Sequence, residues 1–336
     1  MLILLVTSPR VAPGLLTLQA WDVLRGAARV LAPPDHPQHA ALVAAGVDVD
    51  LLHVPAGELA PHLAGVTTGA GDRDVVWLAG PPAHPGGESG EPALEAALEA
   101  AGVPTEVLRG SVDLPGARLL DLVVTMATLR TQCPWDAKQT HESLAPHLLE
   151  EPYEALEALE NGDHRGLREE LGDVLLQVLF HAEVASERDD GTGYTIDDVA
   201  DGIVAKLVRR HPHVFAGVAV TGPDEVVLNW DEIKKAERAQ QASPGDEPGS
   251  ALDGVPLGQP GLSLATQLQR RAARAGLPDE LLATDQPGDG LGDQLFALVA
   301  TARAADLDPE LELRSAARRY RDRVRAWERA HPAPSP

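Results

Sequence analysis

The stretch Leu148–Ala185, LLEEPYEALEALENGDHRGLREELGDVLLQVLFHAEVA, carries the clearest helical pattern of the central part of this chain. In its second half, apolar residues recur at helical spacing and predict an amphipathic helix with one apolar stripe. The positions of that stripe are Leu167, Leu171, Val174, Leu175, Val178, Leu179 and Ala182. Residues 161–163, Asn-Gly-Asp, predict a turn between this helix and an earlier helical half. We therefore expect the two helices to fold back as an antiparallel hairpin.

Five acidic side chains lie on the two helices of this predicted hairpin. They are Glu150, Glu151 and Glu154 on the first helix and Glu170 and Asp173 on the second. Residues three or four apart share a helix face, so the hairpin can direct all five towards one place. Close carboxylates resist joint ionisation. A divalent cation relieves that repulsion, and Mg²⁺ prefers such hard oxygen ligands.

An acidic run on a helix is more often a solvated face than a metal site, and this alternative applies to Glu150–Glu154 taken alone. The second pair weakens it, because Glu170 and Asp173 border the apolar stripe instead of lying opposite it. Two acidic groups on one hairpin therefore favour a metal site over a solvated surface.

The composition of the chain limits its partners. Its 336 residues are enough for two or three domains, and its formal net charge is −23, from 28 basic and 51 acidic residues. That charge repels phosphate backbones and anionic lipids, which argues against nucleic acid or a membrane as the main partner. It does not exclude a nucleotide, because a bound divalent cation reverses the local field. The scarcity of aromatic residues, with 3 Phe, 3 Tyr and 5 Trp, favours helical packing.

The cysteine content and the amino-terminal residues indicate the cellular compartment that we expect for the protein. Cys133 is the single cysteine, so no internal disulfide and no cysteine-built metal site can form. The start, MLILLVTSPR, has no basic leader and is typical of a first strand instead of a signal peptide. The longest apolar runs, such as Val174–Phe180, are far too short to span a bilayer. We expect a soluble, cytoplasmic protein.

The first part of the chain alternates strand-like and helix-like runs, as in an α/β unit. The expected strands are Leu2–Val6, Val49–Val54, Asp74–Leu78 and Thr105–Leu108, and the expected helices are Leu16–Val30 and Ala93–Ala101. The stretch Gly80–Glu91 is rich in glycine and proline and is expected to be a loop.

From about Arg118 the pattern turns helical and stays so to Gln241. Ser243–Gly261 has the composition of a linker, because its four prolines and five glycines break regular structure. Leu262–Ala330 is helical again and ends in an arginine-rich helix.

The arrangement EExxE, a spacer and ExxD resembles the signature of the all-α nucleoside triphosphate pyrophosphohydrolases, and the surrounding residues are similar to the MazG family in particular. The likeness includes CPWDAKQTHESLAPHLLEE at Cys133–Glu151, KLVRRHPHVF at Lys206–Phe215 and NWDEIKKAER at Asn229–Arg238. It extends from Leu119 to Gln241 almost without interruption. The resemblance implies a dimeric four-helix bundle that hydrolyses a nucleoside triphosphate to its monophosphate and pyrophosphate.

The resemblance also implies roles for individual residues. The implied metal ligands, for Mg²⁺ with Mn²⁺ as a substitute, are Glu151, Glu154, Glu170 and Asp173, with Glu150 beside them. We expect Glu150, Glu154 and Glu170 to be the catalytic residues. The sequence does not show which glutamate orients the attacking water, and our hypothesis is Glu150 or Glu154. The implied substrate-binding residues are Lys206, Arg210, Trp230 and Lys234.

The substrate-binding pairs also suit a nucleotide on physical grounds. Lys206 and Arg210, one helical turn apart, can neutralise a triphosphate. Trp230, one turn from Lys234, offers a stacking surface for a base. The ordinary alternatives are a solvated basic face for the first pair and a core anchor for Trp230.

Two prolines affect this interpretation. Pro152 departs from the family pattern inside the first acidic motif, where it removes a helical hydrogen bond and clashes with the carbonyl of Leu148. We therefore expect a kinked helix or a new helical segment near Pro152. Pro212 marks a helix end, so His211 and His213 on either side of it are not expected to bind metal.

The flanking regions resemble degraded domains. Leu291–Leu307 is similar to the second domain of two-domain MazG proteins, with Asp293 in the place of the last acid but Gly290 in the place of its partner. The first region resembles half of a tetrapyrrole methylase, with TSPRVAPG where a glycine-rich loop is expected. We expect neither to be active. The expected domains are 1–115 (α/β), 116–242 (catalytic, all-α), 243–261 (linker) and 262–330 (degenerate helical repeat).

We therefore expect a homodimeric, Mg²⁺-dependent hydrolase that removes nucleoside triphosphates, non-standard ones included, from the nucleotide pool. A narrower alternative hydrolyses dUTP or phosphoribosyl-ATP. An alternative of another class is a regulatory or scaffold protein without turnover. The retention of the motif acids together with their basic and aromatic partners argues against that last alternative.

Overall fold

The structure is a computed structural model that describes residues 1–80, 91–222, 225–226, 229–230, 233, 237, 250–278 and 290–331. Its contacts divide the chain into two compact units, Met1–Val218 and Ala219–Pro336. The first unit holds an α/β part followed by helices, and the second is helical where it is described, so the protein is multidomain. The predicted domain boundaries at residues 115, 242 and 261 stay predictions.

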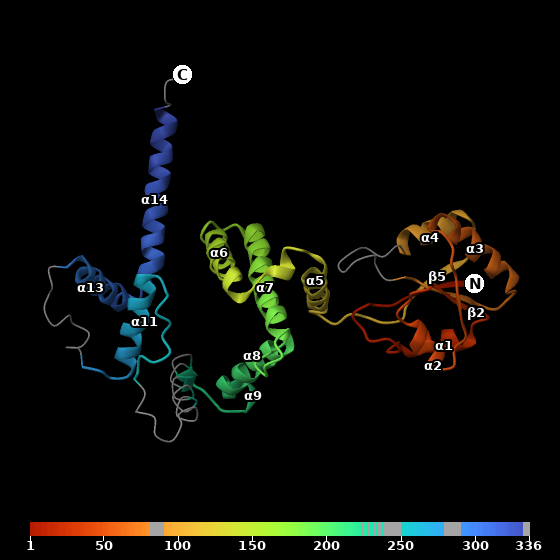
Figure 1. Ribbon diagram of the computed structural model, residues 1–336, viewed down its shortest axis with the longest axis horizontal. Coiled ribbons are helices and arrows are strands. Elements are labelled where there is room, and N and C mark those ends of the chain that lie inside the picture. Colours follow the sequence, from red (N-terminus) through yellow and green to blue (C-terminus); the bar gives the residue numbers. More distant parts are fainter. Residues whose placement is uncertain are drawn as a thin grey trace. The chain divides into compact units, whose positions relative to one another are not determined.

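Five parallel strands form a sheet in the first unit, in the order β3-β2-β4-β1-β5 (Figure 1). The strands are β1 (Leu2–Val6), β2 (Arg29–Ala32), β3 (Val49–Leu51), β4 (Val75–Leu78) and β5 (Thr105–Arg109). The central strand β4 and its neighbour β1 are apolar throughout, and every side chain from Val75 to Leu78 is buried. A parallel sheet has this composition when helices cover both of its faces.

Two pairs of helices cover the sheet (Figure 1). They are α1 (Leu18–Gly26) with α2 (His39–Ala44), and α3 (Ala56–Gly69) with α4 (Glu91–Ala100). Ile3 shares a buried cluster with Leu24 of α1, whereas Leu2 shares one with Leu63 of α3. Successive side chains of a strand point to opposite faces, so Leu2 and Ile3 pack against different helix pairs.

Most of the predicted N-terminal elements are confirmed. Leu2–Val6 is β1, and the predicted segments at β4, β5 and α4 agree within two residues. The strand predicted at Val49–Val54 ends at Leu51. The helix predicted at Leu16–Val30 is wrong beyond Gly26, because Arg29–Ala32 is β2. Val30, Leu31 and Ala32 of this short strand are all buried, so apolar and polar residues do not alternate along it. Hydrophobic periodicity therefore cannot distinguish the strand from a continuation of the preceding helix. The loop predicted at Gly80–Glu91 lies almost entirely outside the described residues.

The predicted hairpin is confirmed as α6 (His141–Glu160) and α7 (His164–Ser186), which pack against each other (Figure 1). In the turn, Gly162 has a φ of +68°, which a side chain would disfavour. Asp163 caps α7 by accepting hydrogen bonds from the backbone N–H groups of Arg165 at 3.1 Å and Gly166 at 2.9 Å. Gly162 and Asp163 therefore determine where α7 begins.

Further helices flank the hairpin. They are α5 (Arg118–Gln132), the 3-10 helix η1 (Asp136–Lys138), α8 (Ile196–Arg210) and α9 (Pro212–Phe215). A small buried cluster joins Met126 of α5, Leu144 of α6 and Phe180 of α7. α8 ends before Pro212, as predicted. α6 runs as one helix through Pro152, so no new helix begins there.

From residue 250 onward, the described part of the second unit contains the helices α11 (Gly261–Arg274), α13 (Leu291–Ala304) and α14 (Pro309–Ala330). Gln269 of α11 donates to the carbonyl of Phe296 at 2.8 Å and accepts from Arg303 of α13 at 3.2 Å, which ties these two helices together. The predicted arginine-rich helix is confirmed as α14. Across the described residues of both units, each helix is too short or too polar to cross a bilayer.

Candidate metal centre

The α6–α7 hairpin brings together three of the predicted acids. Glu151 and Glu154 come from α6 and Glu170 from α7, and each offers a carboxylate oxygen within 4.8 Å of the other two. Glu151 and Glu154 share a face because they are three residues apart on one helix. Glu154 and Glu170 lie on different helices, so their close approach crosses the hairpin. The cluster therefore spans the interface between the two helices.

The electrostatics of the cluster follow from this crowding. Burial raises the pKa of Glu151, and the charges of Asp173, Glu154 and Glu150 raise it further. The pKa of Glu170 is also raised, first by burial and then by the charge and the hydrogen bond of Glu154. Both carboxyl groups thus resist ionisation as long as no cation lies among them. Hard oxygen donors that repel one another are the set that fits a divalent cation such as Mg²⁺.

Asp173 and Glu150 lie beside the cluster of three. Asp173 is close enough to raise the pKa of Glu151 by its charge, but it lies outside the group of three whose oxygens lie within 4.8 Å of one another. Glu150 is 61% exposed and faces His147, whose Nδ1 is 3.6 Å from a carboxylate oxygen. Their predicted roles, as a ligand and as an acid beside the ligands, stay predictions.

The predicted substrate-binding residues are distributed over both units. Lys206 and Arg210 lie one turn apart on α8, which contacts α7. Lys206 is exposed and Arg210 is half-buried. Trp230 belongs to the second unit, and Lys234 lies outside the described residues. The grouping of these four residues around a nucleotide stays a prediction.

Sequence reasoning missed His147, which lies beside the acids, and Trp135, whose ring neighbours that of His147. His147 lies three residues before Glu150 and four before Glu151 on α6, a spacing that would have placed it on their face. Its imidazole lies 6.3 Å from the ring of Trp135, centroid to centroid. Trp135 carries no helical spacing to connect it with α6, because it lies in the turn between α5 and η1.

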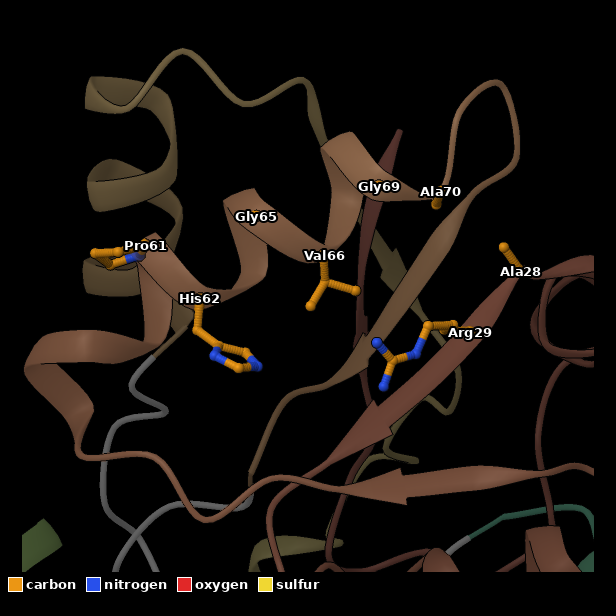
Figure 2. Close-up of a pocket in the computed structure, with 8 residues that line it drawn as sticks. All are labelled: Ala28, Arg29, Pro61, His62, Gly65, Val66, Gly69 and Ala70. Atoms are coloured by element: carbon orange, nitrogen blue, oxygen red, sulfur yellow. The ribbon is translucent and has the colours of Figure 1, made fainter.

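A separate depression of about 720 Å³ lies in the α/β part, between α3 and β2 (Figure 2). Figure 2 shows the side chains of His62 and Arg29 directed into it. Arg29 is already paired with Asp50, through Nε at 2.9 Å and a terminal nitrogen at 2.7 Å. None of the clustered acids lines this depression.

Comparisons with known proteins match the part of the chain that contains the acidic hairpin. Residues 139–215 match the model of the MazG nucleotide pyrophosphohydrolase domain. An uncharacterised 26.1 kDa protein of Streptomyces cacaoi is 46% identical over 223 residues, 66% of this chain and 88% of that protein. The nucleoside triphosphate pyrophosphohydrolase of Escherichia coli is 36% identical over 235 residues, 63% of this chain and 86% of the relative.

Two further comparisons differ in coverage. The nucleoside triphosphate pyrophosphohydrolase of Mycolicibacterium smegmatis is 44% identical over 216 residues, and the match spans 64% of this chain but only 61% of that protein. A crystal structure of a MazG-related protein from Thermotoga maritima matches 34% of this chain and 96% of its own, with 30% identity and a TM-score of 0.31. From the matched domain and from relatives covered over most of their length, we conclude that this chain belongs to the MazG family of nucleoside triphosphate pyrophosphohydrolases.

Proposed function

We propose that this protein hydrolyses nucleoside and deoxynucleoside triphosphates, non-standard ones included, to the monophosphate and pyrophosphate in a Mg²⁺-dependent reaction. One water molecule is consumed, the bond between the α- and β-phosphates breaks, and a proton is released. The observation that carries the proposal is the cluster of Glu151, Glu154 and Glu170 within the matched MazG domain. The proposed role is to remove non-standard nucleotides from the nucleotide pool of the cytoplasm.

In this proposal Glu151, Glu154, Glu170 and Asp173 hold the metal, and Mn²⁺ can replace Mg²⁺. A divalent cation bound there supplies charge for the phosphates and lowers the pKa of a water molecule. The raised pKa values of Glu151 and Glu170 support this assignment, because a cation would replace protons on crowded carboxylates.

The remaining residues would act on the water and on the substrate. Glu154 within the cluster or Glu150 beside it would orient the attacking water, and the contact of Glu150 with His147 would hold that carboxylate in place. Lys206 and Arg210 would pair with phosphate oxygens, and Trp230 and Lys234 would contact the nucleoside.

We also propose that the helical part is a homodimer built as a four-helix bundle. Apolar side chains of the hairpin are exposed in the single chain, among them Leu149 at 65%, Leu159 at 59% and Leu171 at 54%. A second hairpin packed on these side chains would remove their apolar surface from water, which stabilises the dimer. Sedimentation equilibrium should then give twice the mass of the chain, whereas the mass of one chain would contradict the dimer.

The test of the function is an assay with Mg²⁺ and a panel of triphosphates that includes dUTP and phosphoribosyl-ATP, with the monophosphate and pyrophosphate resolved from the diphosphate and phosphate. Glu170→Ala and Asp173→Ala serve as variants. We expect pyrophosphate from several nucleotides and none from either variant. Turnover of dUTP or phosphoribosyl-ATP alone would favour the narrower enzyme, and no pyrophosphate from any nucleotide would favour the scaffold.

A further inference from the structure

The depression between α3 and β2 has the size and the walls of a site for a small molecule. Its volume of about 720 Å³ falls within the roughly 300–1,000 Å³ of pockets that hold such ligands. Pro61 and Val66 give it apolar surface on the side of α3. Gly65 and Gly69, one turn apart on that helix, also line it, and a Cβ built on either would meet no side chain within 4 Å. The backbone of α3 is therefore open to a flat ligand.

Two side chains with hydrogen-bond donors point into the depression. Figure 2 shows the imidazole of His62 on α3 and the guanidinium of Arg29 on β2 directed into it from the two walls. An imidazole has at least one N–H donor in either charge state, and a guanidinium has five in a rigid fork. Donors that converge in this way bind the oxygens of an anion.

The donors of Arg29 and His62 are only partly used within the described residues. Nε and one terminal nitrogen of Arg29 donate to the same oxygen of Asp50, at 2.9 and 2.7 Å. In the part of the chain that the structure describes, the other terminal nitrogen of Arg29 and the imidazole of His62 have no hydrogen-bond partner. Arg29 and Asp50 are 45% and 48% exposed, so water reaches this pair and weakens it. An anion from solution can therefore engage the remaining donors without breaking a buried ion pair.

We propose that the depression binds a phosphate ester that carries a flat ring. A phosphate group presents its oxygens in several directions, so one group can accept hydrogen bonds from Arg29 and from His62 on opposite walls. The ring would lie against the open backbone at Gly65 and Gly69 and would remove the apolar surface of Val66 from water. The net charge of −23 does not prevent this, because charges more than about 10 Å away are largely screened at physiological ionic strength. The acids of α6 and α7 do not line the depression, so the ligand would bind whether or not they hold a cation.

The test is isothermal titration calorimetry on the full chain with a chelator present, so that phosphates do not bind through metal at the acidic cluster. The ligands are phenyl phosphate, inorganic phosphate and benzoate. Phenyl phosphate should bind at least about tenfold more tightly than inorganic phosphate, because its ring leaves water on binding. It should also bind more tightly than benzoate, whose planar carboxylate reaches only one wall. No binding of phenyl phosphate at millimolar concentration, or equal binding of the three ligands, would overturn the proposal.

Three variants test whether the ligand lies in this depression. Arg29→Gln should weaken the binding of phenyl phosphate about tenfold, since it removes a charged donor. Asp50→Asn should strengthen binding, because Arg29 then loses the carboxylate that competes with the ligand. Gly65→Leu should abolish binding by filling the space, and a helix accepts leucine better than glycine. Circular dichroism and Tm check that each variant is folded.

Arg73→Gln is the matched control. Arg73 carries the same charge as Arg29 but does not line the depression, and it donates to the carbonyl of Ala27 at 2.9 Å. Its loss should change the affinity by less than about twofold, because an exposed charge that does not contact the ligand is screened by solvent and salt. Equal losses for Arg29→Gln and Arg73→Gln, or unchanged binding to Gly65→Leu, would overturn the proposal.

Discussion

Among the single residues, Glu151 and Glu170 lie close to other carboxylates, and a bound cation would relieve the repulsion between these charges. Their acidic character and helical spacing predicted that they would meet across a hairpin, and they do. Helical spacing could have placed His147 on the face of Glu150. It could not show that Asp173 lies beside the group of three, because side-chain directions depend on how the two helices pack.

The raised pKa values of Glu151 and Glu170 predict how the metal-free protein responds to pH. A carboxyl group whose pKa is higher in the folded state keeps its proton there longer, so its stabilising contribution is present below about pH 4.5 and is lost as the pH rises through the raised value. Mg²⁺ must displace those protons, so the increase in Tm that it causes should grow over the same range.

Thermal unfolding between pH 4 and 8, with and without millimolar Mg²⁺, measures this effect. Glu154→Gln is the control, because it removes a neighbouring charge and should weaken both the pH dependence and the response to Mg²⁺. An increase in Tm that is the same at every pH would show that these carboxyl groups do not bind the cation.

At the scale of elements, the hairpin was predictable and several N-terminal elements were not. α7 has an apolar stripe from Leu167 to Ala182 that covers about four helical turns, which no strand imitates. β2 has four residues and α2 has six, too few to establish a period. The course of α6 through Pro152 was not predictable either, because packing of α6 on α7 maintains a helix that local preference disfavours.

Pro152 should therefore be a site at which α6 can be stabilised. Pro152→Ala supplies a backbone N–H for the carbonyl of Leu148 and removes the ring that crowds it. A proline in a helix interior costs about 3 kcal/mol relative to alanine, and part of that cost should be recovered as a higher free energy of unfolding. Urea denaturation measures the change. A lower free energy of unfolding in the variant would mean that the backbone at Pro152 is not strained.

At the scale of the whole molecule, an ion-pair network joins the α/β part to the helical part within the first unit. Arg10, which follows β1, donates to Asp113 at 2.9 Å through Nε and to both carboxylate oxygens of Asp121 of α5 at 3.0 Å. These partners are 103 and 111 residues distant along the chain, so no local spacing could have predicted the contact. The α/β character of the first part was predictable, whereas its attachment to α5 was not.

Removal of Arg10 should destabilise this unit strongly. Its side chain is only 9% exposed, and Arg10→Ala leaves two carboxylates without their shared cation. Breaking a buried pair in this way costs about 3–5 kcal/mol. Arg29→Ala is the matched control, because the Arg29–Asp50 pair is about half exposed and should contribute at most about 1 kcal/mol. Equal losses in the two variants, measured by urea denaturation, would contradict a structural role for the network.

In the proposed reaction, the acids of α6 and α7 hold the cation on which pyrophosphate release depends. This dependence is measured as the rate of pyrophosphate release after removal of metal with a chelator and titration with Mg²⁺, for the wild type and for Glu170→Gln. We expect the wild type to regain its full rate and the variant to remain at least about 100-fold slower at saturating Mg²⁺. Mutation of a residue that only hydrogen-bonds to a metal ligand costs about 10- to 100-fold, so loss of a ligand itself should cost at least as much. A wild type that is fully active without metal, or a variant that recovers the wild-type rate, would contradict the claim.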